Sequence, residues 1–333
     1  MTPSQGAGAL AVVTAVLLAG CGSDTPSSTA EPSSSESAQA ADSNPVIDRD
    51  FPDPDVLEVD GTFYAYGTNG QNRNVQVAKS TDLETWEDLP DDALPELPSW
   101  VIEGKTWAPE VTQLEDGSFV MYTTTTNFEP ALQCIAVATA DSPEGPFEIV
   151  GDEMLVCPED DGGAIDASTF LDEDGTRYLL WKNDGNCCGL DTWLHIAPLS
   201  DDGLSLAGKE TKLVKQDQPW EGNLVEAPTM VEHEGTYVLM YSANDYGSDK
   251  YAIGYATADS PTGPFTKAEE PLLTTDGSEG RFVGPGGQDV VTARDGSDRL
   301  VFHSWDVAFL QRAVYVVPLD WDDGRPVVEL DQG

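Results

Sequence analysis

Basic residues are scarce in this 333-residue chain. It has 16 Lys and Arg against 60 Asp and Glu, a net charge of −44, and only four of the acids lie between Cys21 and Asn44. Phosphate groups are bound by basic surfaces, so this composition excludes nucleic acids and anionic membrane surfaces as partners. Two interpretations of the acidity stay open. It is either a solvated surface that keeps a secreted protein soluble, or an adaptation to high salt, which screens charge repulsion.

Sustained helical periodicity is also missing, and so is any long apolar run. Residues 7–20 are apolar but too few to span a bilayer comfortably, and they end in Leu18-Ala19-Gly20-Cys21. This ending resembles the bacterial lipobox, whose cysteine is diacylated, although Met1–Gly6 lacks the Lys or Arg of a typical signal peptide. We therefore predict a lipoprotein signal peptide over residues 1–21, with lipidation at Cys21. The alternative is a buried N-terminal helix.

Large apolar side chains are absent from residues 22–43, which consist largely of Ser, Thr, Pro, Ala and Glu. Such a segment cannot bury a core, so we predict a disordered tether. The catalytic or binding domain then comprises residues 44–333. We expect it to be a monomer on the extracellular face of a bacterial membrane, in an oxidising space, with membrane contact only through the anchor.

An internal repeat of about 60 residues is the strongest structural signal. Each copy has an apolar strand, a turn with glycine and a strand with aromatic residues, and the copies cover 56–68, 111–124, 170–182, 230–242 and 290–304. Asp-Gly and Glu-Gly between such runs are hairpin signals. A further strand pair follows in each copy, and ATADSPEGPF and ATADSPTGPF recur 118 residues apart. Five such units predict an all-β, five-bladed β-propeller; a two-sheet sandwich would not need this period.

Three carboxylates precede first strands of these units. Asp53 lies 8 residues before the turn glycine of its unit, while Asp166 and Glu226 each lie 9 before theirs. First strands line the channel of a propeller, so we expect the three to share nearly the same structural position, with the hairpins absorbing the offset. Asp and Glu also flank turns without doing chemistry. Here they stand among apolar residues, where a charge is costly unless it has a task.

The motifs DFPDPDVL, WAPEV, AIDASTFLDEDGTRYLLW and VEAPTMVEHEGTYVLMYSANDY closely resemble glycoside hydrolase family 43, and the resemblance runs from about Asn44 to Val328. It implies a five-bladed propeller that hydrolyses glycosides with inversion and requires no cofactor. Asp53 matches the general base, Asp166 the residue that orients the acid and tunes its pKa, and Glu226 the general acid. Inversion would place acid and base about 6.5–9.5 Å apart.

The resemblance also suggests pocket residues. Trp107 and Arg312 match residues beside the substrate, with inter-blade packing as the alternative for Trp107. Asn244 and Asp245 could face sugar hydroxyls or form a turn. His303, counted from its hairpin, stands where other units have an aromatic residue. Many members of the family hold a calcium ion at the channel axis beside such a histidine, so calcium near His303 is an expectation, weakened because several relatives have histidine where Gln288 stands.

Cysteine is limited to five residues, and four remain once Cys21 is lipidated. They allow three pairings, of which we expect Cys134–Cys157 together with a vicinal Cys187–Cys188 bridge. No C-x-x-C spacing of a zinc site occurs.

We expect release of terminal L-arabinofuranosyl residues from arabinan or arabinoxylan-type polysaccharide. β-1,4-Xylosidase and endo-1,5-α-L-arabinanase activities are alternatives on the same fold. A surface carbohydrate-binding propeller without turnover is the alternative of another class, and the three carboxylates argue against it. Retaining fructan-active relatives use an Asp in a WMNDPNG-type motif, which PDPDV does not match.

Overall fold

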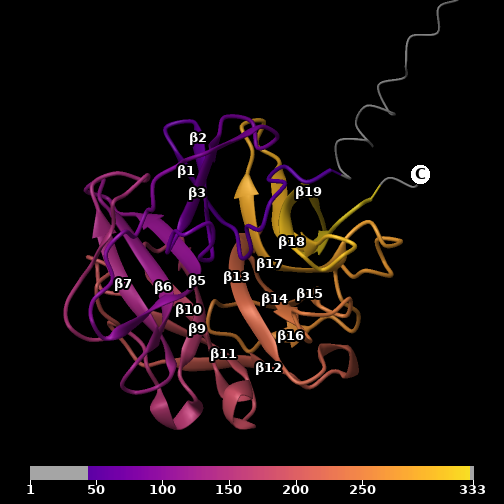
Figure 1. The fold of residues 1–333 in the computed structure, drawn as a ribbon. Coiled ribbons are helices and arrows are strands. Elements are labelled where there is room, and N and C mark those ends of the chain that lie inside the picture. Colours follow the sequence, from indigo (N-terminus) through magenta and orange to yellow (C-terminus); the bar gives the residue numbers. More distant parts are fainter. Residues whose placement is uncertain (1–43, 331–333) are drawn as a thin grey trace, which may run out of the picture.

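The computed structural model describes residues 44–330, which form five four-stranded antiparallel sheets around a central channel (Figure 1). Each sheet uses four consecutive strands, so the predicted five-bladed β-propeller is confirmed. The strands are β1 (Asp55–Val59), β2 (Thr62–Gly67), β3 (Gln76–Ser80), β4 (Trp86–Asp88), β5 (Val101–Gln113), β6 (Phe119–Asn127), β7 (Gln133–Ala140), β8 (Glu148–Ile149), β9 (Ala164–Leu171), β10 (Arg177–Asn183), β11 (Trp193–Pro198), β12 (Thr211–Lys215), β13 (Val225–His233), β14 (Thr236–Ala243), β15 (Ala252–Ala258), β16 (Thr266–Lys267), β17 (Val283–Thr292), β18 (Asp298–Trp305), β19 (Arg312–Asp322) and β20 (Arg325–Val327). Three short 3₁₀ helices lie in loops: η1 (Glu159–Asp161), η2 (Gly185–Cys188) and η3 (Pro219–Glu221).

The first hairpin of each blade has one of two turn lengths. Blades 1 and 4 use two-residue turns, because Val59 pairs with Thr62 and His233 with Thr236. In Asp60-Gly61 both residues have positive φ, as a tight hairpin turn requires. The first hairpins of blades 2, 3 and 5 have five-residue loops instead. Counting back from the turn glycine therefore gives different structural positions in different blades.

Each blade has a left-handed residue two positions before the regular pairing of its first hairpin begins. Its φ lies between 43° and 57° in all five blades: Asp53, Ala108, Asp166, Ala227 and Gly287. Asp53 and Asp166 therefore share a structural position, as predicted. Glu226 comes one residue earlier, at the position of Trp107 and Ile165, so placing it level with Asp53 was wrong. Blades 1 and 4 have turns of the same length, so the hairpin does not absorb the one-residue difference between Asp53 and Glu226.

Side chains of the first strands link the blades around the channel. Three junctions share one pattern, in which a carboxylate accepts the amide of the next blade at 2.8 Å: Asp55 from Val111, Glu110 from Thr169 and Asp289 from Val56. Asp166 Oδ2 accepts the Ala227 amide at 3.0 Å, and Thr229 Oγ1 donates to the Gln288 carbonyl at 2.7 Å. Every junction between first strands thus carries a side-chain hydrogen bond.

Apolar clusters fill the spaces between neighbouring blades. Trp181 packs with Val137 of blade 2, whereas the adjacent Leu180 packs with Leu239 of blade 4. Successive strand residues face opposite sides, so one strand serves two interfaces. Five clusters of this kind, one at each junction, form the core.

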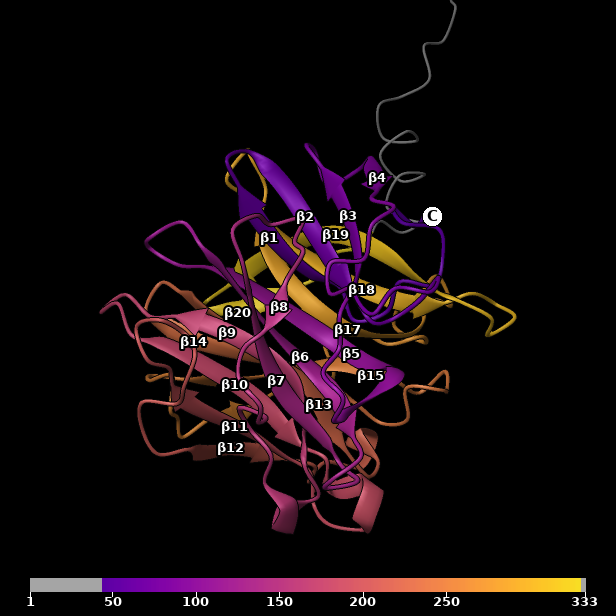
Figure 2. The same ribbon diagram turned by 60° about the vertical axis from the view of Figure 1, so that its left-hand side comes forward.

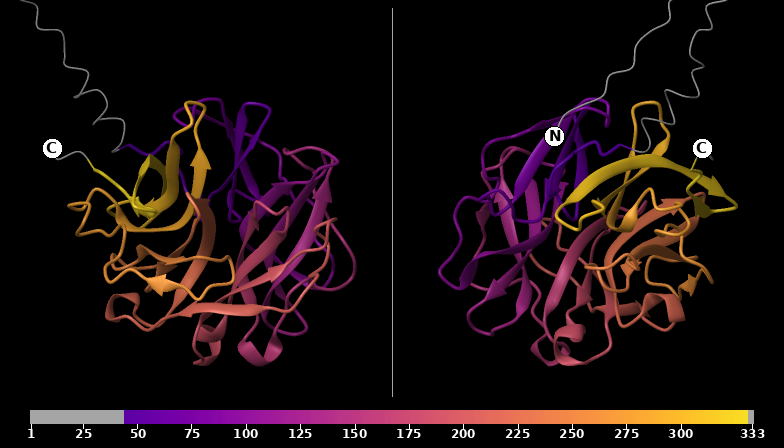
Figure 3. Two further views of the ribbon diagram at one scale, coloured as in Figure 1. Left: turned by 180° about the vertical axis from the view of Figure 1, so that it is seen from behind. Right: turned by 45° about the vertical axis from the view of Figure 1, so that its right-hand side comes forward.

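The N-terminal segment closes the ring. Val46 N donates to Val314 O at 2.8 Å, and Phe51 N donates to Arg312 O at 2.9 Å, so this segment runs along β19. The indigo and yellow ends of the domain accordingly lie side by side in Figures 2 and 3. This pairing fixes Asp53, two residues beyond Phe51, against blade 5.

The predicted signal peptide, the lipidated Cys21 and the tether lie outside residues 44–330. Within that range no helix has the length and apolarity needed to cross a membrane. The structure contains disulfides between Cys134 and Cys157 and between Cys187 and Cys188, the pairing expected from the sequence.

Candidate active site

A cavity of about 370 Å³ opens at one end of the channel. Such a volume lies in the range of small-ligand sites. We call it the channel pocket; it is lined by Asp53, Trp107, Gln133, Ile165, Asp166, Lys182, Asp184, Asn186, Leu224, Glu226, Asp245, Tyr246, Tyr251 and Arg312. The three predicted carboxylates therefore meet in one pocket, although they are far apart in sequence.

Asp53 is held from two sides. Thr68 Oγ1 donates to its Oδ2 at 2.7 Å, and its own amide donates to His303 Nδ1 at 3.0 Å. The side chain is 23% exposed, more than Glu226 at 12%, so it can reach water in the pocket. Its left-handed backbone, at φ 55°, costs about 1–3 kcal/mol for a non-glycine residue and is held by these contacts.

Asp166 is enclosed between blades 3 and 4. Its Oδ2 accepts the Ala227 amide, and its amide donates to Thr124 Oγ1 at 3.1 Å. Burial raises the pKa of Asp166 well above its usual range, and the nearby Glu226 raises it further, while Lys182 acts in the opposite direction. Two neighbouring carboxyl groups cannot both ionise cheaply, so Asp166 tends to retain its proton.

Glu226 receives a hydrogen bond on each carboxyl oxygen. Lys182 Nζ donates to Oε2 at 3.0 Å, and the Tyr251 hydroxyl donates to Oε1 at 2.8 Å. The two donors belong to different blades: Lys182 lies on β10 in blade 3, and Tyr251 lies just before β15 in blade 4. The orientation of the carboxyl group is therefore fixed before any substrate arrives.

Lys182 and its partners were missed in the sequence. Lys182 is buried and also lies 3.6 Å from Asp184 Oδ1, and Gln133 Nε2 donates to Asp184 Oδ2 at 2.7 Å. Burial alone would lower the pKa of Lys182, but Glu226, Asp166 and Asp184 outweigh it, so the pKa is raised and the ammonium form is retained. A lysine in the apolar strand YLLWKN was the available signal.

His303 lies one position beyond the aromatic residue of its blade. Phe302 pairs with Tyr315 as Trp181 pairs with His195, so Phe302 takes the aromatic place and His303 corresponds to Lys182. The prediction that His303 stands in the aromatic position was wrong, because His303 lies seven residues after Gly296, whereas Trp181 lies six after Gly175 in a loop of the same length. Its ring is buried and stacks on Tyr251 at 6.0 Å.

Calcium is not a good fit to the groups around His303. Burial lowers the pKa of His303 well below its usual value, and Arg312 adds to this, so the ring is neutral. Nδ1 accepts the Asp53 amide, which leaves Nε2 as the single unpartnered nitrogen of this ring among the described groups. Calcium takes six to eight oxygen ligands. Residues 44–330 include no group of three or more His, Cys, Asp or Glu arranged to hold a metal.

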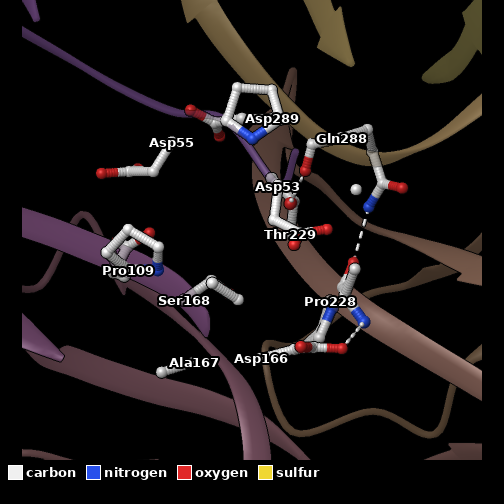
Figure 4. A pocket seen from close by; sticks show the side chains of 15 residues that line it. Asp53, Asp55, Pro109, Asp166, Ala167, Ser168, Pro228, Thr229, Gln288 and Asp289 are labelled. Atoms are coloured by element: carbon white, nitrogen blue, oxygen red, sulfur yellow. Dashed lines mark hydrogen bonds between the residues drawn. The ribbon is translucent and has the colours of Figure 1, made fainter. Parts of the chain in front are cut away.

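A much smaller cavity, of about 40 Å³, continues along the channel axis (Figure 4). Asp53 and Asp166 line it as well as the channel pocket, and Asp55, Asp289 and Ser168 line it alone. A water molecule needs roughly 10–15 Å³, so this axial cavity has room for a few waters and none for a sugar ring. The channel pocket therefore has a closed floor.

Trp107 and Arg312 line the channel pocket, as expected from the sequence. The Arg312 guanidinium lies over the rings of Tyr246 and Trp305, at 5.3 and 5.4 Å from their centroids. These contacts hold it at the rim of the pocket, which is the placement that a substrate-binding arginine would need.

Asn244 does not reach the channel pocket. Its Nδ2 donates to the Trp220 carbonyl at 2.9 Å, and its Oδ1 accepts the Asp245 amide at 2.9 Å. With φ 77° it forms the turn that the sequence left open as an alternative. Asp245, which was predicted with it, does line the pocket, and so does Tyr246.

The vicinal disulfide belongs to η2, whose Asn186 also lines the channel pocket. The loop of blade 3 that carries Cys187 and Cys188 therefore forms part of the wall, on the side of Lys182 and Asp184.

Comparison with known proteins finds relatives that are named as glycosidases. The chain is 29% identical over 277 residues to beta-D-galactofuranosidase xynD of Aspergillus niger, covering 78% of this chain and 75% of that protein. It is also 29% identical over 261 residues to extracellular endo-alpha-(1->5)-L-arabinanase 2 of Bacillus subtilis, covering 69% and 53%.

Solved structures agree with these relatives. A thermostable family-43 glycoside hydrolase superposes with a TM-score of 0.74 at 31% identity, covering 84% of this chain and 92% of that one. An endo-1,4-beta-xylanase from Bacteroides thetaiotaomicron gives 0.73 at 31% identity, covering 86% and 96%. The sequence pattern of glycosyl hydrolases family 43 matches residues 43–326, nearly the whole folded domain. This chain is therefore a member of glycosyl hydrolases family 43, and it is a glycoside hydrolase by family.

Proposed function

We propose that the channel pocket hydrolyses a glycosidic bond with inversion, with Glu226 as general acid, Asp53 as general base and Asp166 as the residue that orients the acid. The observation that carries this proposal is the meeting of all three carboxyl groups in one pocket, in unlike surroundings. Asp53 is the more exposed and can reach water, Glu226 is the less exposed, and the buried Asp166 beside it has a raised pKa. An acid and a base with different surroundings are what inverting hydrolysis requires.

In the proposed reaction, Glu226 gives its proton to the glycosidic oxygen as the bond from that oxygen to the anomeric carbon breaks. Asp53 takes a proton from a water molecule, which attacks the anomeric carbon from the opposite face. Thr68 and His303 hold Asp53 in place, and Lys182 and Tyr251 hold Glu226. Proton transfers of this kind each contribute about 10²–10⁴-fold to the rate.

We also propose that the enzyme attacks at a chain end. Asp53 and Asp166 line both the channel pocket and an axial cavity that cannot admit a sugar ring, so a sugar unit cannot pass through the channel. Several relatives are named for endo action, which is the alternative.

We propose L-arabinofuranosyl units of arabinan or arabinoxylan-type polysaccharide as the substrate, the activity of an α-L-arabinofuranosidase. The support is similarity to endo-arabinanases and to an arabinoxylan arabinofuranohydrolase of Bacillus subtilis, which is 29% identical over 275 residues. Galactofuranosidase xynD is the relative that favours a second candidate, a galactofuranosyl unit. Both sugars are five-membered furanose rings and would enter the same pocket.

The test is hydrolysis of nitrophenyl α-L-arabinofuranoside, β-D-galactofuranoside and β-D-xylopyranoside, beside linear arabinan with products resolved by size. We expect turnover of the arabinofuranoside and only monomer from arabinan. Arabino-oligosaccharides would contradict exo action, and preferred turnover of another glycoside would replace the sugar. Glu226→Gln and Asp53→Asn serve as inactive controls with the same shape; binding of arabinan by a wild-type protein that cleaves none of these compounds would instead support a carbohydrate-binding propeller.

We further propose lipid anchoring through Cys21 on the extracellular face of the membrane. Support comes from the lipobox-like ending and from relatives that are named as extracellular. Metabolic labelling with a fatty acid should mark the wild-type chain and not the Cys21→Ala variant; equal labelling of both would contradict the anchor.

A further inference from the structure

Lys182 is a buried cation in the wall of the channel pocket. Its side chain is 2% exposed, and it follows Trp181 on β10, in the apolar interior of blade 3. A buried ammonium is destabilising unless it is paired and hydrogen-bonded. Its partners are Glu226 Oε2 at 3.0 Å and Asp184 Oδ1 at 3.6 Å. One of these two partners is the proposed general acid.

Two hydrogen bonds fix the carboxyl group of Glu226 in an orientation that still allows it to transfer a proton. Lys182 occupies the side of Oε2 and Tyr251 the side of Oε1, so the group cannot rotate without losing a hydrogen bond. Each carboxyl oxygen has a second lone pair. A proton carried on such a lone pair can be passed into the pocket while both supporting bonds remain in place.

The charges around Glu226 come from several elements. Lys182 faces it from β10, Asp166 from β9, and Asp184 stands behind Lys182 after β10. From blade 1, the negative charge of Asp53 raises the pKa of Asp166 and of Tyr251. Arg312 faces the pocket from blade 5, and Asp245 faces it from blade 4. When Glu226 loses its proton, the group of carboxylates gains a negative charge. Lys182 is the buried cation in direct contact with the oxygen that receives it.

We propose that Lys182 is a positioning residue that holds Glu226 through this ion pair and stabilises the carboxylate formed as the glycosidic oxygen is protonated. The inference rests on the proposed function of Glu226 as general acid. The proton moves from Glu226 to the glycosidic oxygen, the bond to the anomeric carbon breaks, and its electron pair stays with the leaving oxygen. The negative charge left on Glu226 is then matched by the ammonium of Lys182.

A purely structural role would make a different prediction. Lys182 also joins blade 3 to blade 4 through Glu226, so its loss could lower activity only by loosening the fold. Such loosening would lower the rate at all pH values and for all leaving groups. Loss of charge stabilisation instead moves the alkaline limit of activity and affects poor leaving groups most, because these depend most on protonation.

The test compares three variants with the wild type. Lys182→Met keeps the length and removes the charge, Lys182→Arg keeps the charge, and Lys182→Met with Asp184→Asn removes one charge of each sign. We measure kcat/KM from pH 4 to pH 9 on the nitrophenyl glycoside that the wild type cleaves, and on the matching methyl glycoside. Thermal unfolding of each variant is recorded in parallel.

For Lys182→Met we expect the alkaline limb to move up by about 1 pH unit, the lower end of the effect of an adjacent opposite charge. We also expect at least about tenfold greater loss on the methyl glycoside than on the nitrophenyl glycoside. Lys182→Arg should keep the wild-type limb. In the double variant the alkaline limb should move in the same direction by a smaller amount. If Lys182→Met does not fold, the double variant provides the test of the role of Lys182.

If the wild type is active and the alkaline limb of the pH profile does not move in the charge-removing variants, the proposed role of Lys182 is overturned while the proposed function stands. A uniform loss on both glycosides would do the same. A wild type that cleaves no glycoside would contradict the proposed function, and the role of Lys182 would fall with it.

Discussion

At the residue scale, the site depends on backbone positions that few side chains tolerate. Gly287 takes the left-handed position in blade 5, with φ 56°. A Cβ atom there would lie 2.6 Å from His303 Nδ1 and 2.8 Å from Asp53 Oδ1. Contacts that close require Asp53 or His303 to move. Glycine at this position therefore makes room for the proposed base.

Gly287→Ala should lower kcat/KM by about 100-fold, the typical effect of a displacement near 1 Å at a reacting group. The control is Gly247→Ala, where the added Cβ would meet only Asp245 Oδ1 at 3.4 Å. Steady-state kinetics on the nitrophenyl substrate checks both. Wild-type activity in Gly287→Ala would show that Asp53 tolerates displacement and would count against its role as base.

Sequence motifs were sufficient to find Asp53, Asp166, Glu226, Trp107 and Arg312, since each lies in a recognisable segment. Lys182 and Tyr251 could not be found in this way. Their importance comes from hydrogen bonds to Glu226, which residues 44 and 25 positions away make only after the blades have packed. Asn244 failed for the opposite reason: local turn geometry satisfied its amide.

At the scale of strands, a second group of carboxylates joins the blades below the site. Asp55, Glu110 and Asp289 accept amides across three junctions. Burial raises the pKa of Asp55 well above its usual value, and Glu110 and Asp289 raise it further. Burial likewise raises the pKa of Asp289 to about 7. These groups bind protons more tightly in the folded state than in the unfolded chain, where an aspartate has a pKa near 3.9.

Their contribution to stability is therefore full below about pH 4 and is lost as the pH rises through the folded-state values, which reach about 7 for Asp289. Asp55→Asn mimics the protonated form, because its oxygen can accept the Val111 amide and its NH₂ can donate to Glu110. We expect the melting temperature of Asp55→Asn relative to wild type to rise between pH 5 and pH 8. A difference that is independent of pH would contradict the shared protonation of this group.

The strand arrangement was predictable because the hairpin glycines recur at regular intervals. The register of the strands within each hairpin was not predictable, because it depends on the length of the turn. Two-residue turns in blades 1 and 4 and five-residue loops elsewhere shift the count by one, which misaligned Glu226 with Asp166. His303 was misplaced by one further residue, because it lies seven positions after Gly296 and the aromatic Phe302 lies six after it. A one-residue change in a strand moves a side chain to the other face, so the error matters for any site.

At the scale of the whole molecule, the net charge of −44 is the dominant electrostatic feature. Like charges spread over a folded domain repel one another and destabilise the compact state. Salt screens such repulsion, and the screening length falls from about 10 Å at 0.1 M to about 3 Å at 1 M.

We expect the melting temperature to rise between 0.1 and 1 M NaCl. Sucrose over a range of concentrations is the control, since it stabilises folded proteins without screening charge. A melting temperature that falls or stays level in NaCl while sucrose raises it would mean that surface repulsion is unimportant, and would favour the interpretation of the acidity as a solubility feature.

The whole molecule brings Glu226 of blade 4 and Asp53 of blade 1 into one pocket, and we propose that they are the acid and the base of inverting hydrolysis. The most direct measurement is proton NMR of the first sugar released from the nitrophenyl substrate, before mutarotation, with Glu226→Gln as a blank. We predict that the new hemiacetal has the anomeric configuration opposite to that of the substrate. A product that retains the configuration would contradict the roles of Asp53 and Glu226.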